Sequence, residues 1–255
     1  MKKVVLSMFI ATLVFTSCKN ESSEPKTDVK VNDIALADTT IEEPAPEYLY
    51  VTASSGLSLR EYNNLSSDRI AKMPYGTRVK VITPENKLTM NVSGISGGMN
   101  EVEFNRKKGF AFNGYLSKFF PPDTDIKVKG YVEELQEYFP EVRYFESVGG
   151  SVSQPSNAET LVLPTTLWHE AFFIAQQLFE FPKEFDYPNP KGIDKEVIRY
   201  SKSKKENLKN QLEVARFDNK LERIEYVYES LKFDRTITIV KDGNMMNISE
   251  IETIK

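Results

Sequence analysis

The chain has 255 residues but only one cysteine, Cys18, which lies directly after an apolar leader. One thiol can form neither an intramolecular disulfide nor a metal site built from several thiolates. The folded part must therefore be held together by its hydrophobic core and its hydrogen bonds. Its 40% apolar and 27% charged residues are typical of a soluble globular chain, so the sequence can supply such a core.

Residues 1–17 have the three parts of a secretory signal peptide. Two lysines supply the positive start, an apolar stretch runs to Phe15, and two small residues precede Cys18. About a dozen apolar residues are too few for a transmembrane helix, which needs about 20. The pattern therefore predicts a leader that is cleaved before Cys18.

The residues around Cys18 resemble a lipobox, although Phe15 stands where that motif usually has leucine. The resemblance implies a lipoprotein whose thiol carries acyl chains such as palmitate. Each buried CH₂ group contributes about 0.8 kcal/mol, so several chains form a durable membrane anchor. The alternative is an incidental thiol after ordinary cleavage. Lys19 and Glu21 partly resemble a surface-export signal, so we expect a cell-envelope location at the outer membrane, on its periplasmic or its surface face.

Residues 18–46 have the composition of a disordered acidic linker. From Lys19 to Pro46 there are seven acidic residues, three lysines and three prolines, and there is no aromatic side chain. Such a segment cannot bury enough apolar surface to offset the cost of ordering. We expect it to act as a spacer with a mean span of roughly 30 Å.

From residue 47 to residue 122, short apolar runs alternate with turn residues, as expected for short strands. We predict strands over residues 57–60, 78–81, 101–104 and 109–112. Tight turns are expected at 74–76 and 105–108. Five or six strands in about 70 residues favour a small β-barrel.

Three blocks of this region resemble a bacterial SH3 domain. Residues 55–60 (SGLSLR), 70–76 (IAKMPYG) and 109–117 (GFAFNGYLS) follow the order and spacing of the family's G-L-N-L-R, L-P-Y-G-x-x-V and G-Y-V-x-x-x-Y-L signatures. The resemblance covers a little over a quarter of the chain and implies an SH3-like barrel. It places five aliphatic residues in the core: Leu57, Leu59, Val79, Val81 and Val102.

The ligand groove of such a domain would use aromatic side chains. The family usually has tryptophan where this chain has Met99, and methionine lacks a flat stacking surface. The aromatic residues available are Tyr62, Tyr75, Phe110, Phe112 and Tyr115. Two interpretations stay open. Most of these rings fill the barrel, or Arg60, Tyr62 and Tyr115 line a groove for a wall peptide, a glycan or a protein.

The sequence pattern of residues 126–255 predicts an α+β domain. Helical spacing is seen over residues 128–139, a polar loop is expected over 149–158, and a short strand over 159–163. The clearest helix covers 167–181, because its apolar residues form one broad stripe and a proline follows. Thr165 or Thr166 can cap its start, and Glu170 complements the positive end of its dipole.

The last fifty residues alternate strongly between apolar and polar side chains. The pattern predicts an antiparallel meander with one face on the 167–181 helix. Asp218-Asn219 and Asp242-Gly243 are the expected hairpin turns. The predicted fold is therefore mainly β plus α+β: a small SH3-like β-barrel followed by a meander packed on a helix. A C-terminal region of this kind after an SH3-like domain resembles uncharacterised envelope lipoproteins. That resemblance implies no activity.

Charge and residue counts exclude several function classes. Without the leader there are 31 basic and 37 acidic side chains, so we expect no nucleic-acid partner. The lysine-rich run Lys202–Lys209 is interpreted as a solvated segment. His169 is the single histidine, and Phe173 stands where a zinc-protease helix would need a second one. We expect His169 at a surface or boundary, and no catalytic residue, metal or cofactor.

The sequence therefore favours a membrane-tethered envelope lipoprotein that acts as a non-enzymatic binding module. Two alternatives stay open: an accessory or targeting subunit of a cell-wall hydrolase, and a protective lipoprotein of the inhibitor or immunity type.

Removing the proposed anchor tests the lipid interpretation. The Cys18→Ala variant should leave the membrane fraction, because no acyl chain can then be attached. Fractionation after a carbonate wash checks this. A variant that still sediments with the washed membranes would contradict lipidation at Cys18.

Overall fold

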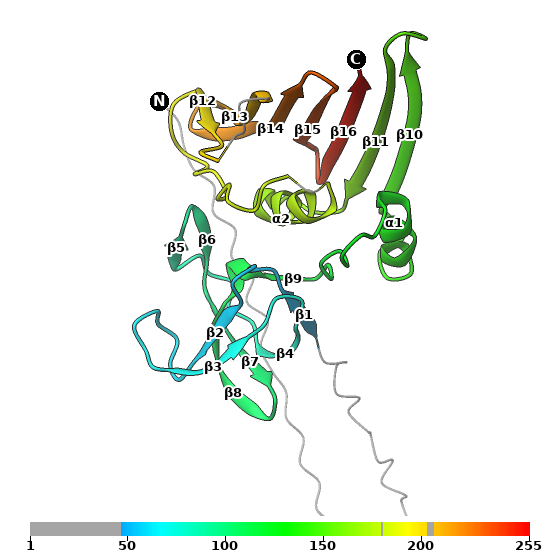
Figure 1. The fold of residues 1–255 in the computed structure, drawn as a ribbon. Helices are drawn as coiled ribbons and strands as arrows, with labels where there is room; N and C mark the ends of the chain where they lie inside the picture. Colours follow the sequence, from blue (N-terminus) through cyan, green and yellow to red (C-terminus); the bar gives the residue numbers. More distant parts are fainter. Residues whose placement is uncertain (1–46, 180, 203–206) are drawn as a thin grey trace, which may run out of the picture. The chain divides into compact units, whose positions relative to one another are not determined.

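The computed structural model describes residues 47–179, 181–202 and 207–255, which form mostly β-structure with two α-helices. The expected leader, the lipidated Cys18 and the linker up to residue 46 lie outside the described residues. Within the described ranges, neither helix combines the length and the apolar character needed to cross a membrane. Figure 1 shows two antiparallel sheets with helix α2 between them.

The first sheet contains the strands of the SH3-like region in the order β3-β2-β8-β7-β4-β1-β9. Their bounds are β1 Tyr48–Val51, β2 Leu57–Arg60, β3 Arg69–Met73, β4 Arg78–Thr83, β7 Met99–Phe104, β8 Lys107–Phe112 and β9 Leu116–Ser117, while β5 Met90–Val92 and β6 Ile95–Gly97 form a separate hairpin. In the part of the chain that the structure describes, no sheet closes into a barrel. The predicted barrel therefore stays a prediction.

Side-chain alternation explains how this sheet forms its core. The five aliphatic residues predicted to be buried are each at most 8% exposed. The turn between β7 and β8 contains Asn105 and Arg106, both with positive φ. Two such residues form the type I′ turn that fits the twist of a two-stranded hairpin. A tight turn thus occurs within the predicted range 105–108, but it is two residues long because β8 begins at Lys107.

The second sheet is a seven-stranded antiparallel sheet in the order β10-β11-β16-β15-β14-β13-β12. Its strands are β10 Arg143–Gly150, β11 Pro155–Leu163, β12 Lys195–Arg199, β13 Asn207–Phe217, β14 Lys220–Ser230, β15 Phe233–Asp242 and β16 Met245–Ile254. The loop predicted over 149–158 is wrong except for the turn at residues 151–154, because residues 143–150 of β10 pair with residues 155–162 of β11. The polar composition reflects strands with little burial rather than a loop.

The two predicted hairpin turns of the meander both occur. Asp218 and Asn219 have positive φ and connect β13 to β14. The second turn lies one residue later than predicted, because Asp242 pairs with Met245 and leaves Gly243 and Asn244 as the loop. Only Gly243 has positive φ there. This is the type II′ pattern, with glycine first.

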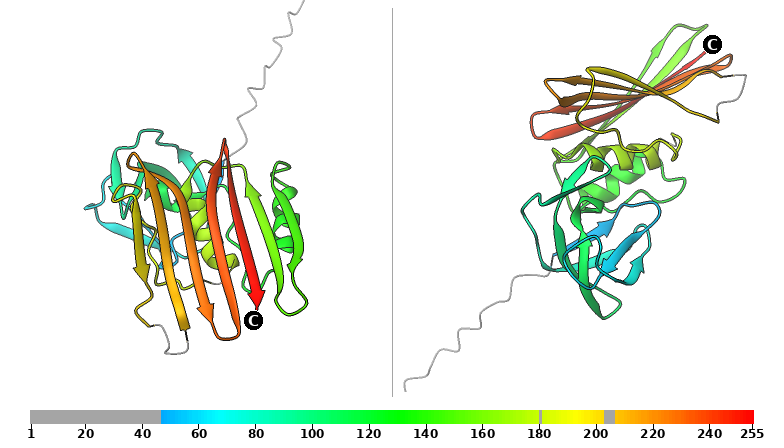
Figure 2. Two further views of the ribbon diagram at one scale, coloured as in Figure 1. Left: turned by 90° about the horizontal axis from the view of Figure 1, so that it is seen from above. Right: turned by 90° about the vertical axis from the view of Figure 1, so that its left-hand side faces the viewer.

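Both helices are shorter than the sequence predicts. Helix α1 covers Val128–Gln136 and α2 covers Trp168–Leu178. Neither Thr165 nor Thr166 is the N-cap of α2, which is Leu167. Helix α2 contacts β15 and β16, and Figure 2 shows it against one face of the sheet. Buried residues from both sheets belong to one hydrophobic cluster.

A buried carboxylate connects helix α2 to the first sheet. Glu170, in the first turn of α2, is 5% exposed and accepts a 2.6 Å hydrogen bond from the Ser117 hydroxyl of β9. The Thr165 hydroxyl donates a second 2.6 Å hydrogen bond to its other oxygen. Burial raises the pKa of Glu170, while these hydrogen bonds oppose the shift. Removing the carboxyl would leave two buried hydroxyls without this acceptor.

The Glu170→Ala substitution should lower the free energy of unfolding by about 3 kcal/mol, because buried hydrogen-bonding groups lose their partner. Ser117→Ala should cost about 1 kcal/mol, since Glu170 keeps its bond from Thr165. Urea unfolding checks both values. A loss below about 0.5 kcal/mol for Glu170→Ala, typical of a neutral surface change, would contradict this role.

Candidate functional site

A cleft of about 310 Å³ lies between the first sheet and the segment that follows α2. One wall is the β1–β2 turn with the start of β2, and the β5–β6 hairpin adds Val92 and Ser93. The opposite wall is residues 183–187. Because residues far apart in sequence line it, the cleft exists only where the two halves of the fold meet.

Aromatic rings form the floor of the cleft. Tyr115 lies 5.8 Å from Phe112 and 5.9 Å from Phe173, measured between ring centroids. Phe173 also lies 6.4 Å from Tyr187. Phe112 and Tyr187 are buried, whereas Tyr115 and Phe173 are half-buried and present part of their rings. Such rings can pack against an aliphatic chain or the face of a sugar.

Charged side chains surround this apolar floor. Arg60 from β2, together with Lys183 and Asp186, lines the cleft. One Arg60 nitrogen donates a 2.6 Å hydrogen bond to the Ser67 carbonyl, which holds the side chain in place. Lys183 and Asp186 are exposed. The cleft thus offers two cations and one carboxylate beside an aromatic surface.

Of the three predicted ligand residues, the structure brings Arg60 and Tyr115 into this cleft. Tyr115 lies in the short 3₁₀ turn Asn113–Tyr115 between β8 and β9. Tyr62 is not among the lining residues and is 59% exposed. Its loop contributes Leu65 instead. The cleft therefore contains two of the three predicted residues, and their role in ligand binding stays a prediction.

The sequence interpretation missed the wall formed by residues 183–187. Gln176 of α2 holds this wall, because its side-chain amide donates to the carbonyls of Pro182 (2.9 Å) and Phe185 (3.0 Å). The contacts reach backbone oxygens, so they depend little on which residues follow the helix. No pattern in that segment could have revealed them.

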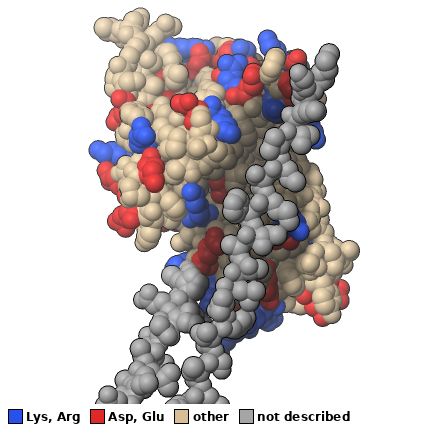
Figure 3. Space-filling model, turned by 180° about the vertical axis from the view of Figure 1, so that it is seen from behind, with Lys and Arg blue, Asp and Glu red and all other residues tan. Residues whose placement is uncertain are grey.

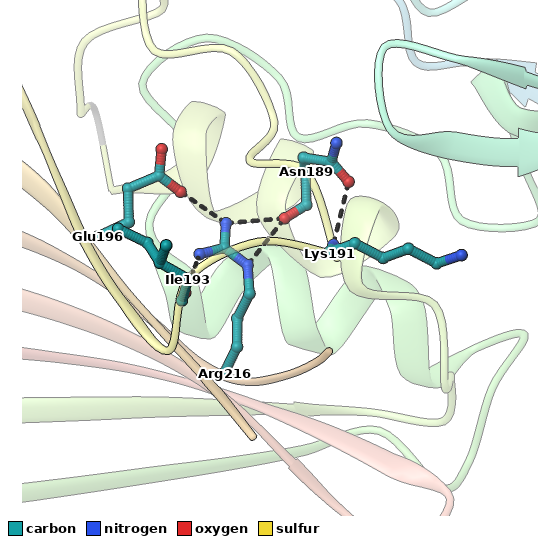
Figure 4. Close-up of polar contacts among 5 residues, drawn as sticks. All are labelled: Asn189, Lys191, Ile193, Glu196 and Arg216. Carbon is teal, nitrogen blue, oxygen red and sulfur yellow. Dashed lines mark hydrogen bonds and ion pairs between the residues drawn. The ribbon is translucent and has the colours of Figure 1, made fainter. Parts of the chain in front are cut away.

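Arg216 of β13 anchors the continuation of the same segment (Figure 4). Its buried guanidinium donates to the Asn189 carbonyl at 2.7 and 3.0 Å, and to the Ile193 carbonyl at 3.0 Å. It also forms a 2.7 Å ion pair with Glu196 of β12. Arginine presents several donors in a fixed plane, so one residue can fix two backbone positions and a strand.

The β5–β6 hairpin packs closely on this anchored segment. A Cβ atom at Gly94 would come within 3.2 Å of both Asn189 and Pro190, and the φ of Gly94 is +83°. Only glycine suits such a close approach in the left-handed region. The hairpin and the segment therefore keep a fixed separation beside the cleft.

His169 lies outside the cleft lining, with its ring 6.0 Å from the Tyr187 ring in an edge-to-face arrangement. Burial lowers the pKa of His169 to about 4. The imidazole is thus neutral at pH 7 and packs behind the aromatic floor. This half-buried position agrees with the predicted boundary location.

Charges of both signs are mixed on the face shown in Figure 3, where no broad patch of one sign is visible on the uncovered surface. In the lysine-rich run, Lys202 pairs with Glu184 at 3.1 Å and Lys209 with Glu229. Residues 203–206 lie outside the described part. Across the described ranges, no three His, Cys, Asp or Glu side chains gather as a metal site would require.

Comparison with known proteins gives no relative: no family model, no curated protein and no solved structure matches this chain.

The histidine predicts a pH dependence. The pKa is lower in the folded state than the ordinary 6.5, so the unfolded chain takes up a proton first as the pH falls. His169 should therefore destabilise the fold progressively from pH 7 to pH 4, by at most about 3 kcal/mol.

The matched variant is His169→Gln, whose unfolding free energy should fall less over this range. The raised pKa of Glu170 acts with the opposite sign, but it is common to both proteins. Urea unfolding at several pH values measures the difference. Parallel pH profiles for the two proteins would contradict a lowered pKa of His169 in the folded protein.

Proposed function

We propose that the protein is a membrane-tethered lipoprotein of the cell envelope, that its folded part is a non-enzymatic binding module, and that the ligand occupies the cleft between the first sheet and the segment that follows α2. The observation that carries the proposal is the meeting of Arg60 and Tyr115 with Phe173 and Lys183 around one cavity. The signal-like leader and the lipobox resemblance at Cys18 support the location.

We further propose that the first sheet is an SH3-like module. The three signature blocks fall on β2 with the preceding turn, on β3 with the following turn, and on the segment from β8 to β9. The first block supplies Arg60 and the third supplies Tyr115. The resemblance and the cleft thus favour the same surface.

The chemistry of the cleft favours a ligand with an anionic group beside an apolar chain or a sugar ring. Arg60 and Lys183 can bind a carboxylate, and Asp186 can bind an amine. Tyr115 and Phe173 supply the apolar contact. Fragments of the bacterial wall, which join short acidic peptides to a glycan, combine these features.

A binding role is favoured over catalysis by the position of the single imidazole. His169 packs on Tyr187 and is not among the residues that line the cleft, and Asp186 is the one carboxylate there, so the cleft has neither a His–carboxylate pair nor the two carboxylates that acid–base hydrolysis uses. The proposed module would hold its ligand without changing it.

Charge reversal in the cleft tests the proposal. The Lys183→Glu variant should bind acidic wall fragments about tenfold more weakly, because a carboxylate then faces a carboxylate. Since Lys183 is exposed, the substitution should leave the thermal stability unchanged. Calorimetric titration of the mature protein with solubilised wall fragments gives both affinities.

The matched control is Tyr62→Ala, an exposed residue outside the cleft, which should bind like the parent protein. Equal losses in both variants, or no binding by the parent, would contradict a ligand site in this cleft.

A further inference from the structure

The two edges of the second sheet differ in how they are protected. The β12 edge is only five residues long and carries Lys195 and Arg199 on the open face of the sheet. Such short, charged edges resist pairing with another chain. The β10 edge is eight residues long, contains no proline or lysine, and pairs with β11 without a bulge. It carries one charge of each sign, Arg143 and Glu146, rather than charges of a single sign, and is the less protected edge.

The backbone groups that β10 leaves free follow from its hairpin. Ser151 and Gln154 exchange two hydrogen bonds, of 3.0 and 3.1 Å, and close the turn. Bonded and non-bonded pairs alternate along an antiparallel ladder. Arg143, Phe145 and Ser147 therefore bond to β11, while Tyr144, Glu146 and Val148 direct their N–H and C=O groups away from the sheet.

The side chains of β10 are also unusually exposed. Phe145 is 55% exposed and Val148 is 82% exposed. Phe145 lies on the open face of the sheet, opposite Thr160 of β11, and Tyr144 lies on the helix-covered face, opposite Leu161. A strand with exposed apolar side chains and outward-directed backbone groups is a template for one more strand.

We propose that β10 pairs antiparallel with β10 of a second copy of this chain, around a two-fold axis at Phe145, so that the two seven-stranded sheets become one. In this register Phe145 faces Phe145 at a non-bonded position, where side chains approach closely. Tyr144 faces Glu146 of the second copy, and their outward backbone groups bond. Arg143 faces Ser147.

Side-chain complementarity selects this register. Each side chain on the open face of one sheet must pair with a side chain on the open face of the other. The two-fold axis must therefore pass through a residue position and not between two residues. An axis at Glu146 would place two carboxylates opposite each other, which is destabilising. An axis at Ser147 would place Phe145 opposite Gly149, with no side chain to contact. An axis at Tyr144 would pair only residues 143–145 of each strand, because β10 begins at Arg143. The axis at Phe145 pairs residues 143–147, places the two Phe145 rings opposite each other and opposes no like charges.

Single-cysteine cross-linking of the full-length chain in intact cells tests the register. Phe145→Cys should form a disulfide-linked dimer under mild oxidation, because a non-bonded antiparallel pair brings the two Cβ atoms within reach. The control is Val148→Cys, which lies on the same strand and is more exposed. Its copies would lie roughly 20 Å apart, so linking should be at least about tenfold weaker.

Every variant keeps Cys18, so a link through that thiol would also appear in the parent chain. Adding Glu146→Pro to Phe145→Cys should abolish the dimer, because proline removes an outward N–H that the monomer does not use. Three outcomes would overturn the proposal: no link at residue 145, equal linking at 145 and 148, or a dimer that survives Glu146→Pro.

Discussion

The fold depends on the contact between β9 and the first turn of α2, where the Glu170 carboxylate accepts hydrogen bonds from Ser117 and Thr165. A buried carboxylate is costly unless its oxygens are bonded, so this group is compatible with only one placement of the helix on the first sheet. The apolar side chains around it supply the stabilising free energy, and the hydrogen bonds of the carboxylate fix the position of the helix. The positions of the residues that line the cleft depend on this placement of the helix.

The cleft also needs a wall in a fixed position, and the segment after α2 forms it. The segment after α2 has no regular secondary structure from residue 181 to 194, yet Gln176 and Arg216 bind four of its backbone carbonyls. A loop held in this way can present Lys183 and Tyr187 at constant positions without belonging to a sheet. Preformed walls of this kind lower the entropy lost when a ligand binds.

The sequence predicted the elements whose faces differ in polarity. The meander, helix α2 and the barrel-region core residues have clear alternation or a clear stripe, and they were found. Strand β11 agrees with the strand predicted over 159–163, but β10 and the start of β11 are missed because both faces near the hairpin tip are exposed, so Ser151 to Ser156 show no periodicity. Arg60 and Tyr115 could be selected from the signature blocks. The buried contact of Arg216 could have been predicted. Arg216 shares the inward face of β13 with Leu212 and Val214, and a cation among inward-facing apolar residues indicates a buried polar contact.

Hydrogen exchange measured by mass spectrometry on the mature protein, with and without solubilised wall fragments, tests the central claim most directly. A ligand in the cleft should slow exchange in two separate segments at the same ligand concentration: the β1–β2 turn through Arg60, and residues 183–187. The outer strands β10 and β12 should be unaffected. Slowing confined to one of these segments, or to the open face of the second sheet, would contradict a site formed jointly by the two halves of the fold.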